Sequence, residues 1–250
     1  MLNYLGNYPN IEYRFGSNEN PVTFKDLSVY IDLIDQIQDS VSAYTKYTIL
    51  SGDRPDIVSY KLYGSVDYYW TFYYLNPNLR ESGWPLNDQD AYNVVTSSYP
   101  HHVVTTENNI AGTRFTVGRK IYGNTSTVEG TIIATKPDLG QIIIDSGTNG
   151  FLVGEQIVTE PDEQLVVSTA SVYSTADQYN SVHHYEDTDG EYVDINPFNQ
   201  SSTNGLIPVT YLERFIAKNN DQKQIKVLKR EIITAVNSQF NALLWYKIIN

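Results

Sequence analysis

Apolar and polar positions alternate briefly before residue 50 and then recur at helical spacing, which predicts a strand followed by helices. Tyr47 and Ile49 belong to the strand, and Gly52-Asp53 forms the turn that leaves it. Residues 56–63 have the spacing of a short helix that Gly64 stops. This segment therefore begins with a strand and a helix joined by a tight turn.

A second helix is expected directly after the first. The Ser65 hydroxyl can cap its start, and Asn76-Pro77-Asn78 ends it, because proline cannot continue a helix. Nearly every side of this helix is apolar, so another part of the molecule must bury it. Its large apolar residues are Tyr69, Trp70, Phe72, Tyr73 and Leu75.

The regions on either side have their own patterns. Residues 11–15 (IEYRF) resemble a strand, and Thr23 with Asp26 resembles a capping box that opens a helix. After Trp84-Pro85-Leu86 we expect a short helix that ends at Tyr92. The helix opened by Thr23 would carry an apolar stripe formed by Leu27, Tyr30, Ile31, Ile34, Ile37 and Val41.

The C-terminal stretch predicts a strand and then a helix. Ile225 to Leu228 shows the short apolar-polar alternation of a strand that seeks a partner edge. Residues 231–246 have apolar positions at helical spacing and should anchor this arm by burial. These positions are Ile232, Ile233, Val236, Phe240, Leu243 and Leu244.

Between Thr106 and Tyr173 the sequence changes to β-branched residues with frequent Gly, Thr and Asn, which predicts a small all-β unit. It contains a short internal repeat, FTVGRKI from Phe115 and FLVGEQI from Phe151, in which a glycine interrupts or turns a strand. Residues 131–135 and 141–145 flank a five-residue connection and predict a hairpin. We expect five or six short strands in a compact barrel or sandwich.

Together these patterns predict an α+β chain. Its parts are a strand–helix–helix unit over about 44–84 with flanking helices, an inserted small all-β domain, and a C-terminal strand–helix arm. The expected domain ranges are 1–106, 107–172 and 173–250. The third range would return to the main body.

Composition excludes several classes of protein. There is no run of eighteen apolar residues for a membrane span, and MLNYLGNYPN lacks the basic start and apolar core of a secretory signal. We therefore expect a soluble protein without a membrane partner. The absence of cysteine excludes disulfides and thiolate chemistry and fits folding in a reducing cytoplasm.

The net charge is −12, but the charged residues are unevenly distributed along the chain. From Tyr211 onward seven Lys/Arg face three Asp/Glu, which leaves +4 on this arm and −16 on the rest. Such a division suits docking between acidic and basic protein surfaces, although a solvated helix face with compensating charges is an equal reading. The acidic bulk makes nucleic acid a poor partner, because phosphate repels it.

Tyrosine is abundant, at 21 residues, and suits surfaces that become protein interfaces. Some of these rings must nonetheless be core, above all those of the second helix. We expect the assembly interface to draw on the crowded aromatic residues and the basic arm. The candidates are Tyr69, Trp70, Tyr73, Trp84, Lys226, Lys229, Arg230 and Phe240.

The four histidines form two adjacent pairs, His101-His102 and His183-His184, outside the two ends of the β segment. A metal site completed by Glu186, Asp187 or Asp189 is one hypothesis, since imidazole and carboxylate suit zinc. Neighbouring strand residues point to opposite faces, so a pair seldom offers two ligands to one ion. We therefore expect local hydrogen bonding, and no cofactor or metal.

No sequence motif for catalysis is present. The chain has no G-x-S-x-G, H-E-x-x-H, Walker-type or G-x-G-x-x-G segment. Asp53, Asp56 and Asp67 could be considered as a glycosidase pair, but Asp53 suits a turn and Asp67 suits the first turn of a helix. We expect a protein that is not an enzyme.

The segment from Tyr44 to Trp84 resembles a LysM-type module and, more narrowly, the LysM-like wedge subunit of contractile-tailed bacteriophage baseplates. The order of Arg54-Pro55, Leu62-Tyr63-Gly64, Trp70 and Leu75-Asn76, followed by Trp84-Pro85, carries this resemblance. Further blocks resemble the same family over about residues 1–100 and 180–250. Residues 107–172 depart from it.

The resemblance implies a structural wedge protein of the virion, located in the tail baseplate and assembled in the host cytoplasm. Its partners would be other baseplate and tail proteins in a multi-copy, six-fold assembly. The alternative is a glycan-binding LysM module that holds peptidoglycan or chitin between residues 51–54 and 76–80. A cell-wall hydrolase is the third and most distant alternative.

Overall fold

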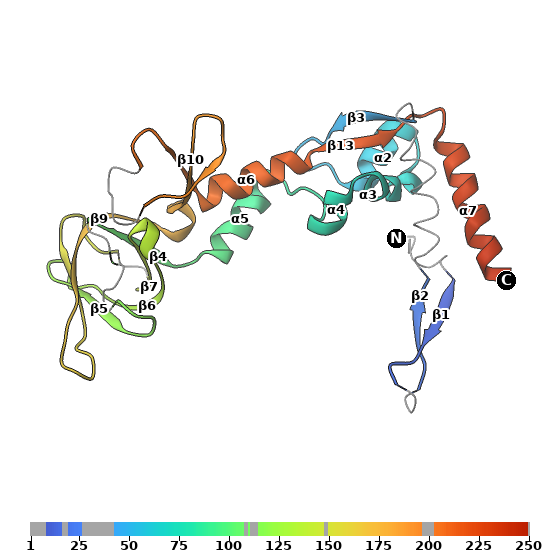
Figure 1. Ribbon diagram of the computed structural model, residues 1–250. Coiled ribbons are helices and arrows are strands. Elements are labelled where there is room, and N and C mark those ends of the chain that lie inside the picture. The colour runs from blue at the N-terminus through green and yellow to red at the C-terminus, as the bar shows by residue number, and fades with distance from the viewer. Residues whose placement is uncertain are drawn as a thin grey trace. The chain divides into compact units, whose positions relative to one another are not determined.

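The computed structural model describes residues 9–16, 20–26, 43–107, 110, 115–147, 150–196 and 203–249. The protein has an α+β fold, as the sequence predicts, with helices and several separate antiparallel sheets (Figure 1). The chain divides into two compact units. Unit 1 combines residues 1–87 with 219–250, and unit 2 is the intervening stretch 88–218.

A two-stranded antiparallel sheet and short helices form unit 1. Strand β3 (Tyr44–Thr48) pairs along its whole length with β13 (Gln224–Leu228). Figure 1 shows α2 and α3 on one side of this sheet. The strand predicted at Ile225–Leu228 is confirmed, and its partner edge belongs to the same chain. The helices are α2 (Pro55–Tyr63), the 3₁₀ turn η3 (Val66–Tyr68), α3 (Trp70–Leu75), α4 (Pro77–Ser82) and α7 (Ile233–Ile249).

Local chemistry sets the bounds of these helices. Pro55 stands in the first turn of α2, where its missing N–H costs nothing. Gly64 ends α2 in the left-handed conformation with φ of 77°, and its N–H donates to the Tyr60 carbonyl at 2.9 Å. The Ser65 hydroxyl accepts from the Asp67 N–H, as expected, but the second helix is divided into η3 and α3.

Aromatic rings form much of the core of unit 1. Trp70 is 4% exposed and stacks on Phe240 of α7 with ring centroids 4.5 Å apart. Tyr63 stacks on Phe72, and its hydroxyl donates to the Leu228 carbonyl at 3.0 Å. These contacts join α2, α3, β13 and α7 around one apolar centre, which explains why the second helix is apolar on nearly every side.

Asn76, in the Asn-Pro-Asn motif, fastens the junction of α3 and α4 to β13. Its Nδ2 donates to the carbonyls of Phe72 and Lys226 at 2.7 and 2.8 Å, and its Oδ1 accepts from the Lys226 N–H at 2.8 Å. The side chain is 5% exposed. A buried amide with all of these partners fixes the register of the helices against the sheet.

Strands β1 (Asn10–Tyr13) and β2 (Val22–Lys25) form a separate antiparallel hairpin. The strand predicted for residues 11–15 is confirmed as far as Tyr13. Thr23 lies within β2, so its predicted role as a helix cap is wrong, because its backbone is paired in the hairpin. The helical stripe from Leu27 to Val41 lies outside the described residues.

The chain leaves and re-enters unit 1 at two residues that are bonded to each other. The Asn219 Nδ2 donates to the Leu86 carbonyl at 3.0 Å, and the Leu86 N–H donates to the Asn219 Oδ1 at 2.8 Å. Asn219 is 7% exposed. This pair, which we call the 86–219 clasp, closes the insertion point of unit 2.

Unit 2 begins with α5 (Asp88–Ser98) and ends within α6 (Tyr211–Gln222). The prediction that the first of these helices ends at Tyr92 is wrong, since it continues to Ser98. The hydroxyls of Thr96 and Ser98 donate to carbonyls one turn earlier, at 3.1 and 2.7 Å. These hydroxyls are therefore satisfied within the helix itself.

A closed six-stranded barrel fills much of unit 2. Its order is β4-β7-β6-β5-β8-β9, and β9 pairs with β4 to close it. The predicted insert, 107–172, is therefore too short, because the closing strands lie at its ends. The hairpin of β6 and β7 is confirmed. The strands are β4 (His102–Thr106), β5 (Lys120–Gly123), β6 (Glu129–Lys136), β7 (Gln141–Asp145), β8 (Gln156–Thr159) and β9 (Thr169–Asp177).

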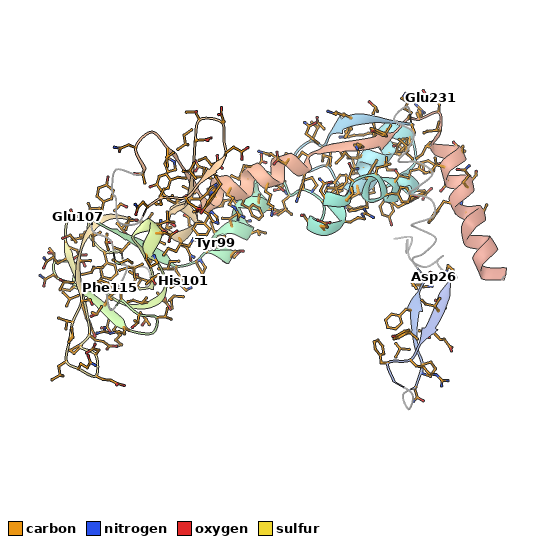
Figure 2. The ribbon with its side chains drawn as sticks, in the orientation of Figure 1. Asp26, Tyr99, His101, Glu107, Phe115 and Glu231 are labelled. Carbon is orange, nitrogen blue, oxygen red and sulfur yellow. The ribbon has the colours of Figure 1, made fainter. Side chains whose placement is uncertain are left out.

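The short internal repeat of the sequence corresponds to two equivalent turns of the barrel. Gly118 and Gly154 have φ of 88° and 83°, and each donates its N–H at 2.8 Å to the strand opposite, at Ile132 and Val172 respectively. Buried Phe115 and Phe151 precede them (Phe115 is labelled in Figure 2). The predicted strands start only after the glycines, so the barrel has two halves built on one local plan.

Glu155 is a buried carboxylate that organises the β5–β6 loop. It accepts from the N–H groups of Thr125, Ser126 and Leu152 at 3.0, 2.8 and 2.5 Å. Burial alone would raise the pKa of Glu155, but these bonds to the ionised form outweigh it and hold that pKa below its usual range. Gly123 packs so closely that a Cβ there would lie within 3 Å of the carboxylate.

A three-stranded sheet completes unit 2, with β10 (Val182–Glu186) between β11 (Tyr192–Val193) and β12 (Ile207–Thr210). Of the helices that the structure describes, none is both long and apolar enough to cross a bilayer.

Candidate assembly interface

The β1–β2 hairpin has one apolar face and one polar face. Ile11 lies opposite Phe24, and Tyr13 lies opposite Val22, so these four side chains share a face, while Asn10, Glu12, Thr23 and Lys25 share the other. The four apolar side chains are 42–57% exposed. Figure 2 shows the rings gathered along one side of the hairpin. We call this surface the hairpin face.

Phe15 extends the hairpin face beyond β1. It is 66% exposed, and its ring lies edge-on to Tyr13 and Phe24, at centroid distances of 5.2 and 6.0 Å. Exposed apolar side chains that are contiguous mark protein contact sites more often than scattered ones do. The sequence predicts a strand here but not this surface, although apolar residues alternate with polar ones on both strands.

The structure distributes the predicted interface residues differently. Trp70 and Phe240 lie in the core of unit 1, because they stack on each other and are about 5% exposed. A neighbouring protein cannot contact these rings without unfolding the unit. Tyr69, Tyr73 and Trp84 pack partly buried against the same core, and the Trp84 Nε1 donates to the Asp53 carbonyl at 2.7 Å.

The basic arm is only partly as expected. Lys226, Lys229 and Arg230 are exposed, and the Lys226 Nζ lies 4.9 Å from the centroid of the Tyr44 ring. The apolar residues predicted to accompany them in an interface are buried instead, because β13 is a strand of the unit 1 sheet: Ile225, Val227 and Leu228.

The polar groups of the two loops considered for glycan binding are largely occupied by the protein itself. Asp53 binds the Lys61 ammonium at 2.6 Å, Arg54 binds Asp56 at 3.0 Å, and Asn76 is committed to β13. The third carboxylate weighed as a glycosidase residue, Asp67, accepts from the Ser65 hydroxyl at 2.9 Å. Each of the three carboxylates therefore has a local structural partner.

The pair His183-His184 points to one side of its strand, contrary to the expectation for neighbouring strand residues. A β-bulge between Val182 and His184 turns the two rings together, so that their Nδ1 atoms lie 3.0 Å apart. His184 continues through its Nε2 to the Glu186 Oε1 at 2.9 Å. Burial lowers the pKa of His183 to about 4, and the positive charge of Arg214 acts in the same direction.

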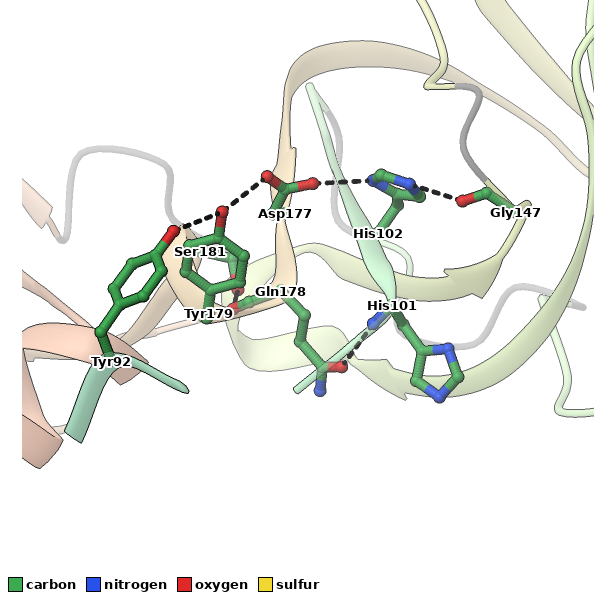
Figure 3. A network of polar contacts seen from close by, with 8 residues as sticks. All are labelled: Tyr92, His101, His102, Gly147, Asp177, Gln178, Tyr179 and Ser181. Carbon is green, nitrogen blue, oxygen red and sulfur yellow. Dashed lines mark hydrogen bonds and ion pairs between the residues drawn. The ribbon is translucent and has the colours of Figure 1, made fainter. Parts of the chain in front are cut away.

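The other pair belongs to a different network, shown in Figure 3. His102 lies between Asp177 and Gly147, with its Nδ1 3.2 Å from the carboxylate and its Nε2 2.9 Å from the carbonyl. Asp177 also accepts a hydrogen bond from the Tyr179 hydroxyl at 3.1 Å. The Tyr179 hydroxyl in turn lies 3.5 Å from the Tyr92 hydroxyl. The network connects α5 to β4, to β9 and to the loop that follows β7.

The four histidines do not converge. Across the ranges that the structure describes, no group of three His, Cys, Asp or Glu side chains is placed to hold a metal ion. Both ring nitrogens of His102 already face protein acceptors, and His184 is similarly committed. The imidazoles of His102, His183 and His184 thus serve as local hydrogen-bonding groups.

Charge follows the division into units rather than the C-terminal arm alone. Unit 2 contains six Lys/Arg and 17 Asp/Glu, a net charge of −11, which leaves 11 Lys/Arg and 12 Asp/Glu, or −1, on unit 1. The charged residues can be counted from the sequence, but the unequal charge of the two units follows only from the unit boundaries.

No known family model matches this chain, and no curated protein matches it.

Proposed function

We propose that this chain is a structural, non-enzymatic subunit of a contractile-tailed phage baseplate, where it contacts other tail proteins as a wedge component. The observation that carries the proposal is the hairpin face, because a soluble protein gains little from an amphipathic hairpin unless another surface covers it. Its location is then the virion, and its partners are neighbouring copies and tail proteins in a six-fold assembly.

The resemblance over residues 44–84 supports the same proposal. In unit 1, β3 is followed by α2, η3, α3 and α4, and β13 pairs with β3 after unit 2. Two strands with helices between them support a LysM-like arrangement in which α4 is an addition and the last strand comes after unit 2. The motif residues Tyr63, Trp70 and Asn76 serve the core and the β13 junction. We infer that the motif preserves a connector rather than a ligand groove.

The test is co-purification with the remaining tail proteins. Tyr13→Ser with Phe24→Ser removes rings from the hairpin face, and Glu12→Ser with Thr23→Ala is the matched control on the polar face. We expect only the first pair to lose the tail proteins while circular dichroism stays unchanged. Equal recovery of both variants would contradict the proposal, and retention on insoluble peptidoglycan would favour the glycan-binding alternative.

A further inference from the structure

The β8–β9 loop is a rigid projection of unit 2. Asp162 and Val166 close a three-residue hairpin turn, with the Asp162 N–H donating to the Val166 carbonyl at 3.0 Å. The Asp162 carboxylate accepts from the N–H groups of Gln164 and Val166, each at 2.9 Å. The Arg119 guanidinium donates to the carbonyls of Glu160 and Val166. The loop is therefore held from both sides.

Leu165 is strained and exposed at the tip of this loop. Its φ is 61°, and it occupies the position of a three-residue hairpin turn at which glycine is usual. The side chain is 84% exposed, and the next two residues, Val166 and Val167, are 41% and 45% exposed. Neither burial nor backbone preference within this chain favours leucine at that place.

We propose that this tip docks on the hairpin face of a second copy of the chain. The proposal deepens the assembly role proposed above by naming the partner of the hairpin face. A rigid tip loses little conformational entropy on binding, and a single large apolar side chain at its end fits the pattern of an interface anchor.

Charge favours unit 1 of the second copy as the acceptor. The tip follows Glu160 and Glu163 on a unit of net charge −11, so a second unit 2 repels it. Unit 1 carries −1, and the charged strand residues of its hairpin, Glu12 and Lys25, balance each other on the polar face. An acidic apolar tip can therefore approach this apolar face without the net repulsion that unit 2 would exert.

A contact between two different surfaces of one chain is heterologous. It joins copies head to tail, and they form a ring where the rotation closes. Each surface can then be removed separately.

Sedimentation velocity of the purified full chain over a concentration series tests the proposal. Leu165→Asn keeps a residue that tolerates the left-handed conformation but removes the apolar anchor, and we expect self-association to weaken about tenfold or more. Phe24→Ser should weaken it similarly. Val117→Thr, which changes a 65% exposed valine on another turn, is the matched control and should leave association unchanged.

Mixing the two variants provides the sharper measurement. Leu165→Asn retains the face and Phe24→Ser retains the tip, so the mixture should form a pair of one copy each that grows no further. A wild-type chain that stays monomeric, or a mixture without pairs, would overturn the inference. If tail proteins still co-purify through the hairpin face in that case, the proposed function stands and only the choice of partner fails.

Discussion

Trp70 shows how one side chain of the resemblance serves the fold. Its ring meets Phe240 face to face and Tyr74 edge-on, at centroid distances of 4.5 and 5.7 Å, and so links α3 to α7. A ring with this many neighbours cannot be removed without leaving a cavity.

Trp70→Ala should therefore lower the free energy of unfolding of unit 1 by about 3 to 5 kcal/mol. Denaturant unfolding followed by far-ultraviolet circular dichroism measures this. Tyr60→Ala, at a 62% exposed position of α2, is the control and should change it by less than about 0.5 kcal/mol. A loss below about 1 kcal/mol at Trp70 would show that the ring is not core.

Glu155 provides a second prediction at this scale. Glu155→Gln places an amide N–H₂ against backbone N–H groups and should cost about 1 to 3 kcal/mol at neutral pH. Because its folded pKa is lowered, the carboxylate stabilises the fold above its unfolded pKa of about 4.3, and this contribution is lost as pH falls through the folded pKa.

The stability difference between wild type and Glu155→Gln should accordingly stay constant from pH 7 to about 5 and shrink in more acidic solution. Unfolding measured across this range tests the sign. Exposed Glu163→Gln is the control and should show no such difference. A gap that widens on acidification would exclude the hydrogen-bonded, ionised carboxylate as its source.

At the scale of elements, the Asn76 contacts decide how the helices are attached to the sheet. Asn76→Ala leaves the N–H and the carbonyl of Lys226 without their partner, while the Phe72 carbonyl keeps the backbone N–H of residue 76, so we expect a loss of about 1 to 3 kcal/mol. Hydrogen exchange at Lys226 should accelerate, while exchange in the β6–β7 hairpin of unit 2 should not. Unchanged protection at Lys226 would mean that backbone pairing with β3 alone holds β13.

Elements with local causes could be predicted from the sequence, and those with distant causes could not. Pro55 and Gly64 give α2 its ends within a few residues, and the β6–β7 hairpin follows from its turn. In contrast, β3 and β13 pair across 176 residues, and no local signal names the partner. The barrel's closing strands, β4 and β9, were missed for the same reason.

The candidate site was predicted less well than the fold. Aromatic crowding indicated Trp70 and Phe240 as important but could not separate core from interface, since both contexts favour large rings. The bulge that turns His183 and His184 together also has no sequence signal. Leu165 could have been noticed only once its turn geometry was known.

For the whole molecule, the separation into units predicts which deletion is tolerated. Removing residues 107–172 would delete four of the six barrel strands and leave only the pairing of β4 with the remainder of β9, so the larger range 88–218 is the appropriate cut. Because the 86–219 clasp joins the two ends, a short Gly/Ser linker in place of 88–218 should leave unit 1 folded.

Helical circular dichroism and slow exchange in β13 would verify that deletion. The same deletion with Asn219→Ala should be less stable, because the clasp is lost. An insoluble product, or one without protected amides in β13, would mean that unit 1 depends on unit 2.

The exposed basic residues of unit 1 give a further prediction at this scale. Reversing Lys226, Lys229 and Arg230 to Glu should spare folding but slow association with tail proteins, and most at low salt, where charges are least screened. Stopped-flow or surface-based association rates at two ionic strengths measure this. Equal rates at low salt would remove these residues from the interface.

The insertion also sets an order of events on the ribosome. Strand β3 is translated 176 residues before its partner β13. At typical rates of protein synthesis, this corresponds to a delay of roughly 10 to 35 s. Unit 2 is continuous and can fold during that interval, whereas unit 1 must remain open. Once folded, unit 2 replaces a long flexible loop, so less entropy is lost when β13 arrives. Slowing translation within residues 88–218 should lengthen the exposure of unit 1 to chaperones and proteases.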